Sequence, residues 1–196
     1  MPPAPPRIVL GSTSRYRAEL LRRLLPDFEQ AAPNTDESPL PNEAPAARAL
    51  RLAIAKAESA ARGYADALVI GSDQVAEVEG LILDKPGTRE RACSQLAASS
   101  GRSVHFHTAF CLLDARDGRR QTHVDHTRAR FRALEPAEIA RYVEREQPLD
   151  CAGSFKCEGL GISLFEAIDS QDPSALIGLP LIALARLLRE AGLDLP

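Results

Sequence analysis

The pair Asp117-Gly118, between two segments of alternating polarity, constrains the fold more than any other feature of the sequence. In the first segment, 103–113, every second residue from Val104 to Phe110 shares one face. The second segment, 122–131, follows the pair and has the same strand-like character. Asp-Gly between two such segments predicts a β-hairpin with a two-residue turn.

Strand-like and helix-like segments alternate along the rest of the chain. We expect strands at 7–10, 67–78 and 81–83, a strand with a loop within 153–165, a polar loop at 31–45, and helices at 15–25, 46–62, 88–99, 136–144 and 180–191. This order predicts an α/β fold, with a mixed twisted sheet flanked by helices and one long inserted hairpin. The chain has 196 residues, of which 44% are hydrophobic. We therefore expect a disordered leader at 1–6 and a single domain over 7–196.

Charge and hydropathy exclude several classes of protein. The net charge of −3 argues against a general nucleic-acid binder, which usually carries a basic excess. The apolar stretches are short and interrupted by charges, so we expect no membrane partner. The first residues lack the apolar core of a signal peptide, and the four cysteines form no Cys-x-x-Cys pair. These features fit a cytoplasmic protein with reduced thiols.

The first candidate binding element is the turn that follows the strand at 7–10. Gly11 and Ser12 lead directly into a helix whose first turn contains Arg15 and Arg17. The N-terminus of a helix offers backbone N–H groups and a positive dipole end, which together with arginines make a phosphate cradle. The alternative is an ordinary serine N-cap with surface arginines.

The second candidate is Asp73, within Gly-Ser-Asp-Gln at the end of a short apolar strand. A carboxylate at that end of an α/β sheet could bind a divalent cation or accept a proton from water. The alternative is an aspartate in a turn. Lys85, Lys56 and Glu37 are each unremarkable alone. As a set with Asp73 they supply the cations and carboxylates that a triphosphate site needs.

The third candidate is the glycine-rich segment 153–161, in which three glycines surround Glu158. Glycines in this density indicate a close approach of the backbone to another group. The alternative is a bulged strand with a turn.

Histidines gather on one face of the predicted hairpin. With a two-residue turn, His107 faces Arg128 and has His126 diagonal to it, while His105 faces Arg130. The two arginines favour a solvated basic face over a metal site.

Taken in order, the motifs resemble those of the Maf family of nucleotide pyrophosphatases, from Ile8 to Leu193. The matching segments are Leu-Gly-Ser-Thr-Ser-x-x-Arg (10–17), Asp-Glu-Ser-Pro (36–39), Leu-Ala-x-x-Lys-Ala (52–57), Gly-Ser-Asp-Gln-Val (71–75), x-Lys-Pro-Gly (84–87), Cys-Ala-Gly-Ser-Phe-Lys-x-Glu-Gly-Leu-Gly-Ile-x-Leu-Phe-Glu (151–166) and Asp-Pro-x-Ala-Leu-Ile-Gly-Leu-Pro-Leu-Ile (172–182). Two of them, Ser-Asp-Gln-Val and Gly-Ser-Phe-Lys-x-Glu-Gly, are similar to the 7-methyl-GTP pyrophosphatase subgroup.

The resemblance implies a Maf/ITPase-like fold, a homodimer, and metal-dependent hydrolysis of a nucleoside triphosphate to the monophosphate and pyrophosphate. The metal is Mg²⁺ or Mn²⁺. Asp73 matches the proton acceptor. We also expect Asp73 and Glu37 to bind the metal, and the sequence leaves open whether Asp73 is the base, a metal ligand or both. The positions that match polar residues around the phosphates and metal are Ser12, Arg17, Glu37, Lys56 and Lys85. The positions that match determinants of base preference are Tyr16, Gln74 and Glu158.

The chain departs from the family pattern at four positions. Arg15 replaces a proline, Ala18 an arginine, and Asp84 a glycine, while Tyr16 stands where the subgroup often has tryptophan. These changes bear on base selectivity more than on the reaction.

The chemistry of 7-methylguanine fits the subgroup. Its ring is positively charged, and an aromatic face such as that of Tyr16 attracts this charged base more strongly than it attracts neutral guanine. Glu158 can accept hydrogen bonds from the N1–H and N2–H₂ edge, which thymine and uracil lack. Two alternatives stay open: a nucleotide-binding regulator of cell division without significant hydrolysis, and the same reaction on another nucleotide.

Overall fold

The computed structural model describes residues 6–196, so the predicted leader lies outside the described residues except for Pro6. The helices and strands are β1 (Arg7–Gly11), α1 (Arg15–Leu21), β2 (Glu29–Gln30), α2 (Pro45–Ala61), β3 (Ala67–Val78), β4 (Leu81–Ile82), α3 (Arg89–Ser99), β5 (Ser103–Asp114), β6 (Arg120–Phe131), α4 (Pro136–Glu146), β7 (Phe165–Asp169) and α5 (Leu181–Glu190). Short 3₁₀ helices stand at Ala152–Ser154, Leu160–Leu164 and Ala175–Ile177. In this described part, no helix has both the length and the apolar character that a membrane span requires.

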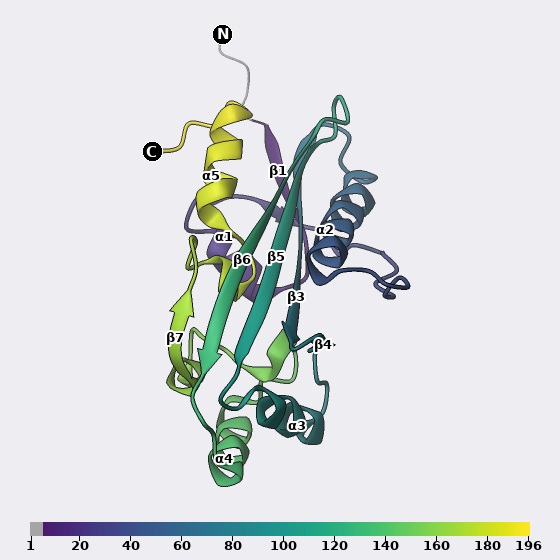
Figure 1. Ribbon diagram of the computed structural model, residues 1–196. Coiled ribbons are helices and arrows are strands. Elements are labelled where there is room, and N and C mark those ends of the chain that lie inside the picture. The colour runs from purple at the N-terminus through teal and green to yellow at the C-terminus, as the bar shows by residue number, and fades with distance from the viewer. Residues whose placement is uncertain (1–5) are drawn as a thin grey trace. The chain divides into compact units, whose positions relative to one another are not determined.

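The strands form one mixed sheet in the order β2-β1-β3-β5-β6-β7, with β4 paired to β3 (Figure 1). β1 pairs in parallel with β2 and β3, whereas β6 and β7 are antiparallel. The predicted α/β class with a mixed sheet and a long hairpin is therefore confirmed.

The chain divides into two compact units. Unit 1 comprises the chain up to Asp73 together with Thr108–Asp125 and Asp172–Pro196, and unit 2 comprises Gln74–His107 and His126–Gln171. The long strands β3, β5 and β6 each contribute residues to both units. The prediction of a single domain over 7–196 stays a prediction.

Unit 1 has three layers because successive side chains of a strand point to opposite faces. Ile8 and Leu10 of β1 join the cluster that contains apolar residues of α1 and α5. Val9, between them, belongs to a second cluster with Ala57 and Ala60 of α2. Strands β3 and β5 alternate in the same way, so α1 and α5 cover one face and α2 the other (Figure 1).

Unit 2 is held together by aromatic rings. Phe131 packs edge-to-face against Phe165, with ring centroids 4.6 Å apart, and Phe155 lies 5.0 Å from Phe165 and 5.2 Å from Phe106. Such T-shaped pairs are favoured by the ring quadrupole and add to the burial of apolar area. Helices α3 and α4 also contact each other in this unit.

The strand predicted within 153–165 is wrong. Two 3₁₀ helices and irregular chain stand there, and β7 begins only at Phe165. Gly153 and Ser154 have φ angles of 75° and 60°, in the left-handed region that a strand does not contain. At Gly161, a Cβ would lie 2.4 Å from the Lys156 carbonyl oxygen, so the chain turns tightly on itself.

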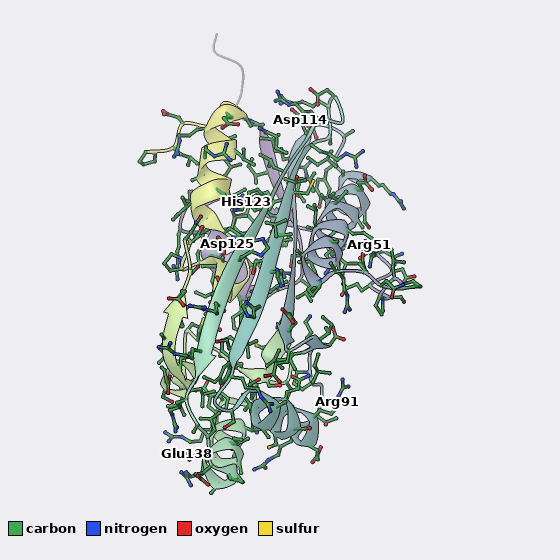
Figure 2. The ribbon with its side chains drawn as sticks, in the orientation of Figure 1. Arg51, Arg91, Asp114, His123, Asp125 and Glu138 are labelled. Carbon is green, nitrogen blue, oxygen red and sulfur yellow. The ribbon has the colours of Figure 1, made fainter. Side chains whose placement is uncertain are left out.

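The hairpin turn is longer than predicted. The Asp114 N–H donates to the Arg119 carbonyl at 2.9 Å, which encloses the residues 115–118. The Asp114 carboxylate accepts from the Arg116 N–H at 3.0 Å, so a side chain starts the turn before Asp117-Gly118 is reached (Figure 2). Gly118, within this turn, has a φ angle of 75°, in the left-handed region that glycine adopts readily.

This longer turn changes the partners of the histidines. The Nδ1 atoms of His107 and His126 lie 2.9 Å apart, so these two side chains face each other. Arg128 instead bonds to Asp169 on β7 at 2.7 Å. The predicted pairing of His107 with Arg128 is therefore wrong.

Helix α1 also differs from its prediction, because it ends at Leu21 rather than at residue 25. The chain continues in turns in which Arg23 and Leu24 bond to carbonyls three residues before them. Such tighter turns commonly close a helix.

Candidate active site

The turn after β1 places Ser12 beneath the start of α1. Ser12 is only 4% exposed, and its Oγ accepts from the Ser14 N–H at 3.1 Å. Ser14 is the N-cap of α1, and its Oγ accepts from the Arg17 N–H at 3.4 Å. Ser14 is therefore an ordinary N-cap residue. Ser12 instead has a buried hydroxyl just after the end of a strand.

Arg17 is not a surface arginine. Its Nε donates to the Gly178 carbonyl at 3.0 Å, and its Nη1 lies 3.5 Å from Ser12 Oγ. Burial lowers the pKa of the Arg17 guanidinium, and the nearby Asp73 and Glu37 carboxylates oppose that shift. A half-buried guanidinium that bonds to carbonyl and hydroxyl oxygens favours an incoming anion.

Gly178 was given no role by the sequence reasoning, although it lies within a recognised motif. Its carbonyl accepts from Arg17 and also lies 3.0 Å from the Ser72 hydroxyl. Gly178 has a φ of 130°, which favours glycine. Nothing in the sequence near Arg17 indicates this contact, because the two residues are 161 positions apart.

Asp73 lies inside strand β3, so the turn alternative does not hold. The parallel pairing of β1 with β3 ends at Gly11 and Gly71, which leaves Asp73 just beyond the carboxyl end of that pair. Asp73 is 8% exposed, and its Oδ1 accepts from Lys56 Nζ at 2.6 Å.

Gly71 explains how Lys56 reaches this carboxylate. A Cβ at Gly71 would lie 2.2 Å from the Ala53 carbonyl oxygen and 2.4 Å from the Ala57 nitrogen. Only glycine allows the backbone of α2 to approach the strand so closely. The approach sets Lys56, one residue before Ala57, against Asp73.

Glu37 completes a cluster of four charges. Its Oε1 lies 2.8 Å from Lys56 Nζ, although 56% of the Glu37 side chain is exposed. Lys56 thus bridges two carboxylates, and Arg17 supplies the second positive charge.

Within residues 6–196, no group of three or more His, Cys, Asp or Glu side chains is arranged to hold a metal ion. The two carboxylate oxygens fit a divalent cation only as part of a ligand set that substrate and water complete.

Tyr16 carries a cation on its ring. The Arg15 guanidinium carbon lies 4.7 Å from the ring centroid, and Arg15 Nη2 donates to the Tyr16 hydroxyl at 2.7 Å. Arg15, which stands where the family has proline, thus lies on Tyr16. The contact is a cation–π arrangement, in which the ring face lies against a positive group.

The remaining predicted residues belong to unit 2. Gln74 follows Asp73 on β3 and is half-buried, whereas Lys85 and Glu158 are exposed. Glu158 Oε2 lies 3.6 Å from Cys157 Sγ, and burial raises the pKa of that thiol to about 12. The structure brings Ser12, Arg17, Glu37, Lys56 and Asp73 together, and the grouping of Gln74, Lys85 and Glu158 with them stays a prediction.

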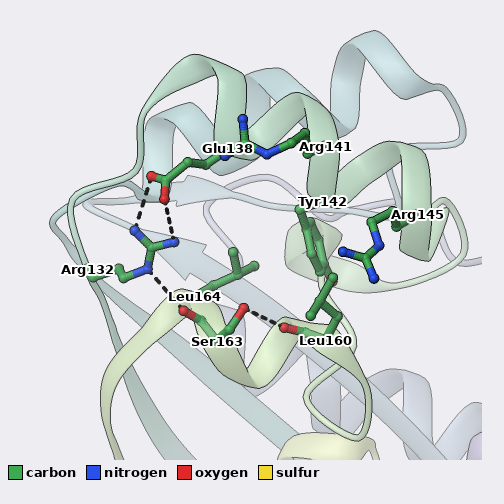
Figure 3. Close-up of a pocket in the computed structure, with 8 residues that line it drawn as sticks. All are labelled: Arg132, Glu138, Arg141, Tyr142, Arg145, Leu160, Ser163 and Leu164. Atoms are coloured by element: carbon green, nitrogen blue, oxygen red, sulfur yellow. Dashed lines mark hydrogen bonds and ion pairs between the residues drawn. The ribbon is translucent and has the colours of Figure 1, made fainter.

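Unit 2 also contains a surface pocket that none of the predicted residues lines (Figure 3). Its lining residues are Arg132, Glu138, Arg141, Tyr142, Arg145, Leu160, Ser163 and Leu164. Arg132 donates to both carboxylate oxygens of Glu138, at 3.1 and 3.0 Å, and to the Ser163 carbonyl. The pocket contains three arginines, and one of them, Arg132, is already paired with Glu138.

Comparison with known proteins agrees with the geometry. The family described as "Maf-like protein" matches residues 7–191 of this chain. A protein of Xanthomonas oryzae pv. oryzae (strain MAFF 311018) named 7-methyl-GTP pyrophosphatase is 59% identical over 192 residues, which cover 97% of this chain and 100% of that protein. A protein of Burkholderia pseudomallei (strain 1710b) with the same name is 57% identical over 195 residues, covering 98% of this chain and 91% of that protein.

Proposed function

Because the chain belongs to the Maf family, we propose that it hydrolyses 7-methyl-GTP to the monophosphate and pyrophosphate. The observation that carries the reaction is the buried contact between Lys56 and Asp73, with Arg17 beside them. The two cations face the charge that a triphosphate brings, and the carboxylate supplies a proton acceptor. The names of the similar proteins support the substrate.

Each residue of the cluster has a task that follows from its position. Arg17 and Lys56 neutralise phosphate oxygens as negative charge develops on the leaving pyrophosphate. Ser12 offers a buried hydroxyl to the same oxygens. Asp73 is fixed through Oδ1 by Lys56, and its other oxygen, Oδ2, receives the proton of the water that attacks the α-phosphorus.

We propose that the reaction depends on Mg²⁺ or Mn²⁺, held by Glu37 and Asp73. A bound divalent cation would offset the charge of the phosphates and lower the barrier to attack. Lys85 is assigned to the phosphate oxygens. The two carboxylates that share Lys56 are hard oxygen ligands of the kind these cations prefer.

Base recognition is assigned to Tyr16, Gln74 and Glu158. The ring of Tyr16 already attracts the Arg15 guanidinium, and a positively charged 7-methylguanine is attracted for the same reason. Glu158 would accept from the N1–H and N2–H₂ edge of the base, and Gln74 would contact a further edge. A homodimer and a cytoplasmic location complete the proposal.

The test is pyrophosphate release by purified protein with 7-methyl-GTP, GTP, dTTP and UTP, each over a Mg²⁺ titration. We expect the highest kcat/KM for 7-methyl-GTP and no release without metal. Asp73→Asn should lose most of the turnover and still bind nucleotide. Nucleotide binding without release from any of the four would favour a regulatory role and contradict hydrolysis.

A further inference from the structure

A long loop lies along α2 and carries Glu37. The loop spans residues 31–44 and contains no helix or strand. At its start, the Asn34 N–H donates to Ser59 Oγ at 2.9 Å, and the Ser59 hydroxyl donates back to the Asn34 carbonyl at 3.2 Å. Further along the loop, Glu37 reaches Lys56. Ordering a loop of this length costs backbone entropy. Contacts of this kind offset that cost and hold the loop in place.

Arg51 of α2, labelled in Figure 2, makes several further contacts to the loop. Arg51 Nε and Nη2 donate to the two carboxylate oxygens of Glu43, at 2.5 and 2.8 Å. Arg51 Nη2 also donates at 3.1 Å to the carbonyl of Ser38, the residue that follows Glu37. The Glu43 side chain is 8% exposed and accepts from the Leu40 N–H at 3.3 Å. A bidentate, mostly buried pair of this kind fixes geometry as well as adding energy.

We propose that Arg51 is a positioning residue for Glu37: paired with Glu43, it clamps the loop so that the Glu37 carboxylate stays against Lys56 and Asp73. Glu37 needs such support, because 56% of its own side chain is exposed. The Asp36 carboxylate assists by accepting from the Ser38 N–H at 2.9 Å, which turns the chain at Glu37. The part of this inference in which Glu37 binds a metal ion rests on the proposed function.

The structure also defines the competing explanation. The positive charge of Arg51 lies close enough to Asp73 and Asp36 for their carboxylates to help raise the pKa of Arg51, after the larger contribution of Glu43. Arg51 would then act on the cluster by its charge alone. The two explanations differ at Glu43, which contributes to the clamp and is not part of the cluster.

The variants are therefore Glu43→Gln, Arg51→Met and Glu37→Gln, with Glu43→Gln also made in the Glu37→Gln background. Glu43→Gln breaks the bidentate ion pair, because an amide has a single acceptor oxygen and no charge, and it keeps the charge of Arg51. Arg186→Met, which breaks an exposed pair with Glu190, is the matched control. The first readout is hydrogen exchange of the loop amides, including those of Glu37 and Ser38, without nucleotide or metal. The second is the Mg²⁺ concentration that gives half-maximal pyrophosphate release.

We expect Glu43→Gln and Arg51→Met to speed exchange in the loop and to raise the half-maximal Mg²⁺ concentration by about tenfold, the usual effect of losing a residue that orients a metal ligand. At saturating Mg²⁺, kcat should change little in Glu43→Gln, and Glu43→Gln should add nothing to Glu37→Gln. Unchanged exchange in Glu43→Gln, or a Mg²⁺ defect in Arg51→Met alone, would overturn the clamp. If the native protein releases no pyrophosphate, the proposed function fails, and the exchange experiment still decides the clamp.

Discussion

Lys56 Nζ lies 2.6 Å from Asp73 Oδ1, and the two residues are 6% and 8% exposed. An ammonium and a carboxylate at this depth lose most of their hydration, and their mutual contact replaces it. Glu37 adds a second acceptor at 2.8 Å from the more open side. The charge proposed for catalysis and the stability of the fold therefore depend on the same pair.

The first prediction concerns that pair. Lys56→Met should lower the free energy of unfolding by about 3 kcal/mol, because Asp73 is left as a buried charge without its partner. It should also lower kcat by at least about 100-fold through the lost phosphate contact. Urea unfolding and pyrophosphate release measure the two effects. Arg186→Met should stay within about 0.5 kcal/mol of the native protein. Equal stability of Lys56→Met and the native protein would contradict this reading of the pair.

The second prediction tests the close approach of α2. Gly71→Ala places a Cβ 2.2 Å from the Ala53 carbonyl oxygen, so α2 must move and carry Lys56 away from Asp73. We expect a loss of about 1–3 kcal/mol in stability together with a fall in kcat. Gly63→Ala is the control, because its Cβ would lie 3.9 Å from the nearest atom, the Ala60 carbonyl oxygen. A Gly71→Ala protein with normal stability and turnover would show that the approach is not required.

The third prediction concerns pH. Burial first, and then the charges of His126 and His105, lower the pKa of His107, while Glu77 opposes the shift. Above the unfolded value of about 6.5 the imidazole is neutral in both states and contributes nothing to the pH dependence. As pH falls below that value, the unfolded chain binds the proton first, so stability is lost. Urea unfolding between about pH 7.5 and 5.5 should show a shallower loss in His107→Gln than in His123→Gln. Equal slopes would exclude His107 as the source.

The fourth prediction addresses base selectivity and rests on the proposed function. Tyr16→Leu should reduce the ratio of kcat/KM for 7-methyl-GTP over GTP by about three- to tenfold, because the ring face that attracts a cation is lost. Tyr16→Phe keeps the ring and removes only the hydroxyl that Arg15 contacts, so it should keep the ratio. A preserved ratio in Tyr16→Leu would refute the role of the ring.

The elements of the fold were largely predictable because their signals are local. Ile8, Val9 and Leu10 alternate between two apolar clusters, as an interior strand flanked by helices requires. The errors arose where the local geometry departs from a regular turn or strand. The Asp114 carboxylate lengthened the hairpin turn, and the positive φ of Ser154 replaced a strand by a 3₁₀ helix.

The site was predictable in its residue types and not in its connections. Arg17, Lys56 and Asp73 stand far apart in sequence, and only the ordered motifs indicated that they act together. The carbonyl of Gly178 and the clamp of Arg51 on Glu43 have no signature in sequence, because each depends on a distance set by the packed fold. The grouping of Gln74, Lys85 and Glu158 with the cluster is still a prediction.

The contact at Gly71 has a mechanical consequence. The α2 backbone from Ala53 to Ala57 fills the space that a side chain at Gly71 would occupy, so helix and strand pack at backbone contact. A slip of one helical turn, about 5.4 Å, would carry the Lys56 ammonium past its carboxylate and bring Leu52 or Ala60 to that place. The absence of a single methyl group at Gly71 thus places Lys56 where it can reach Asp73, and the arrangement of the whole cluster depends on that position.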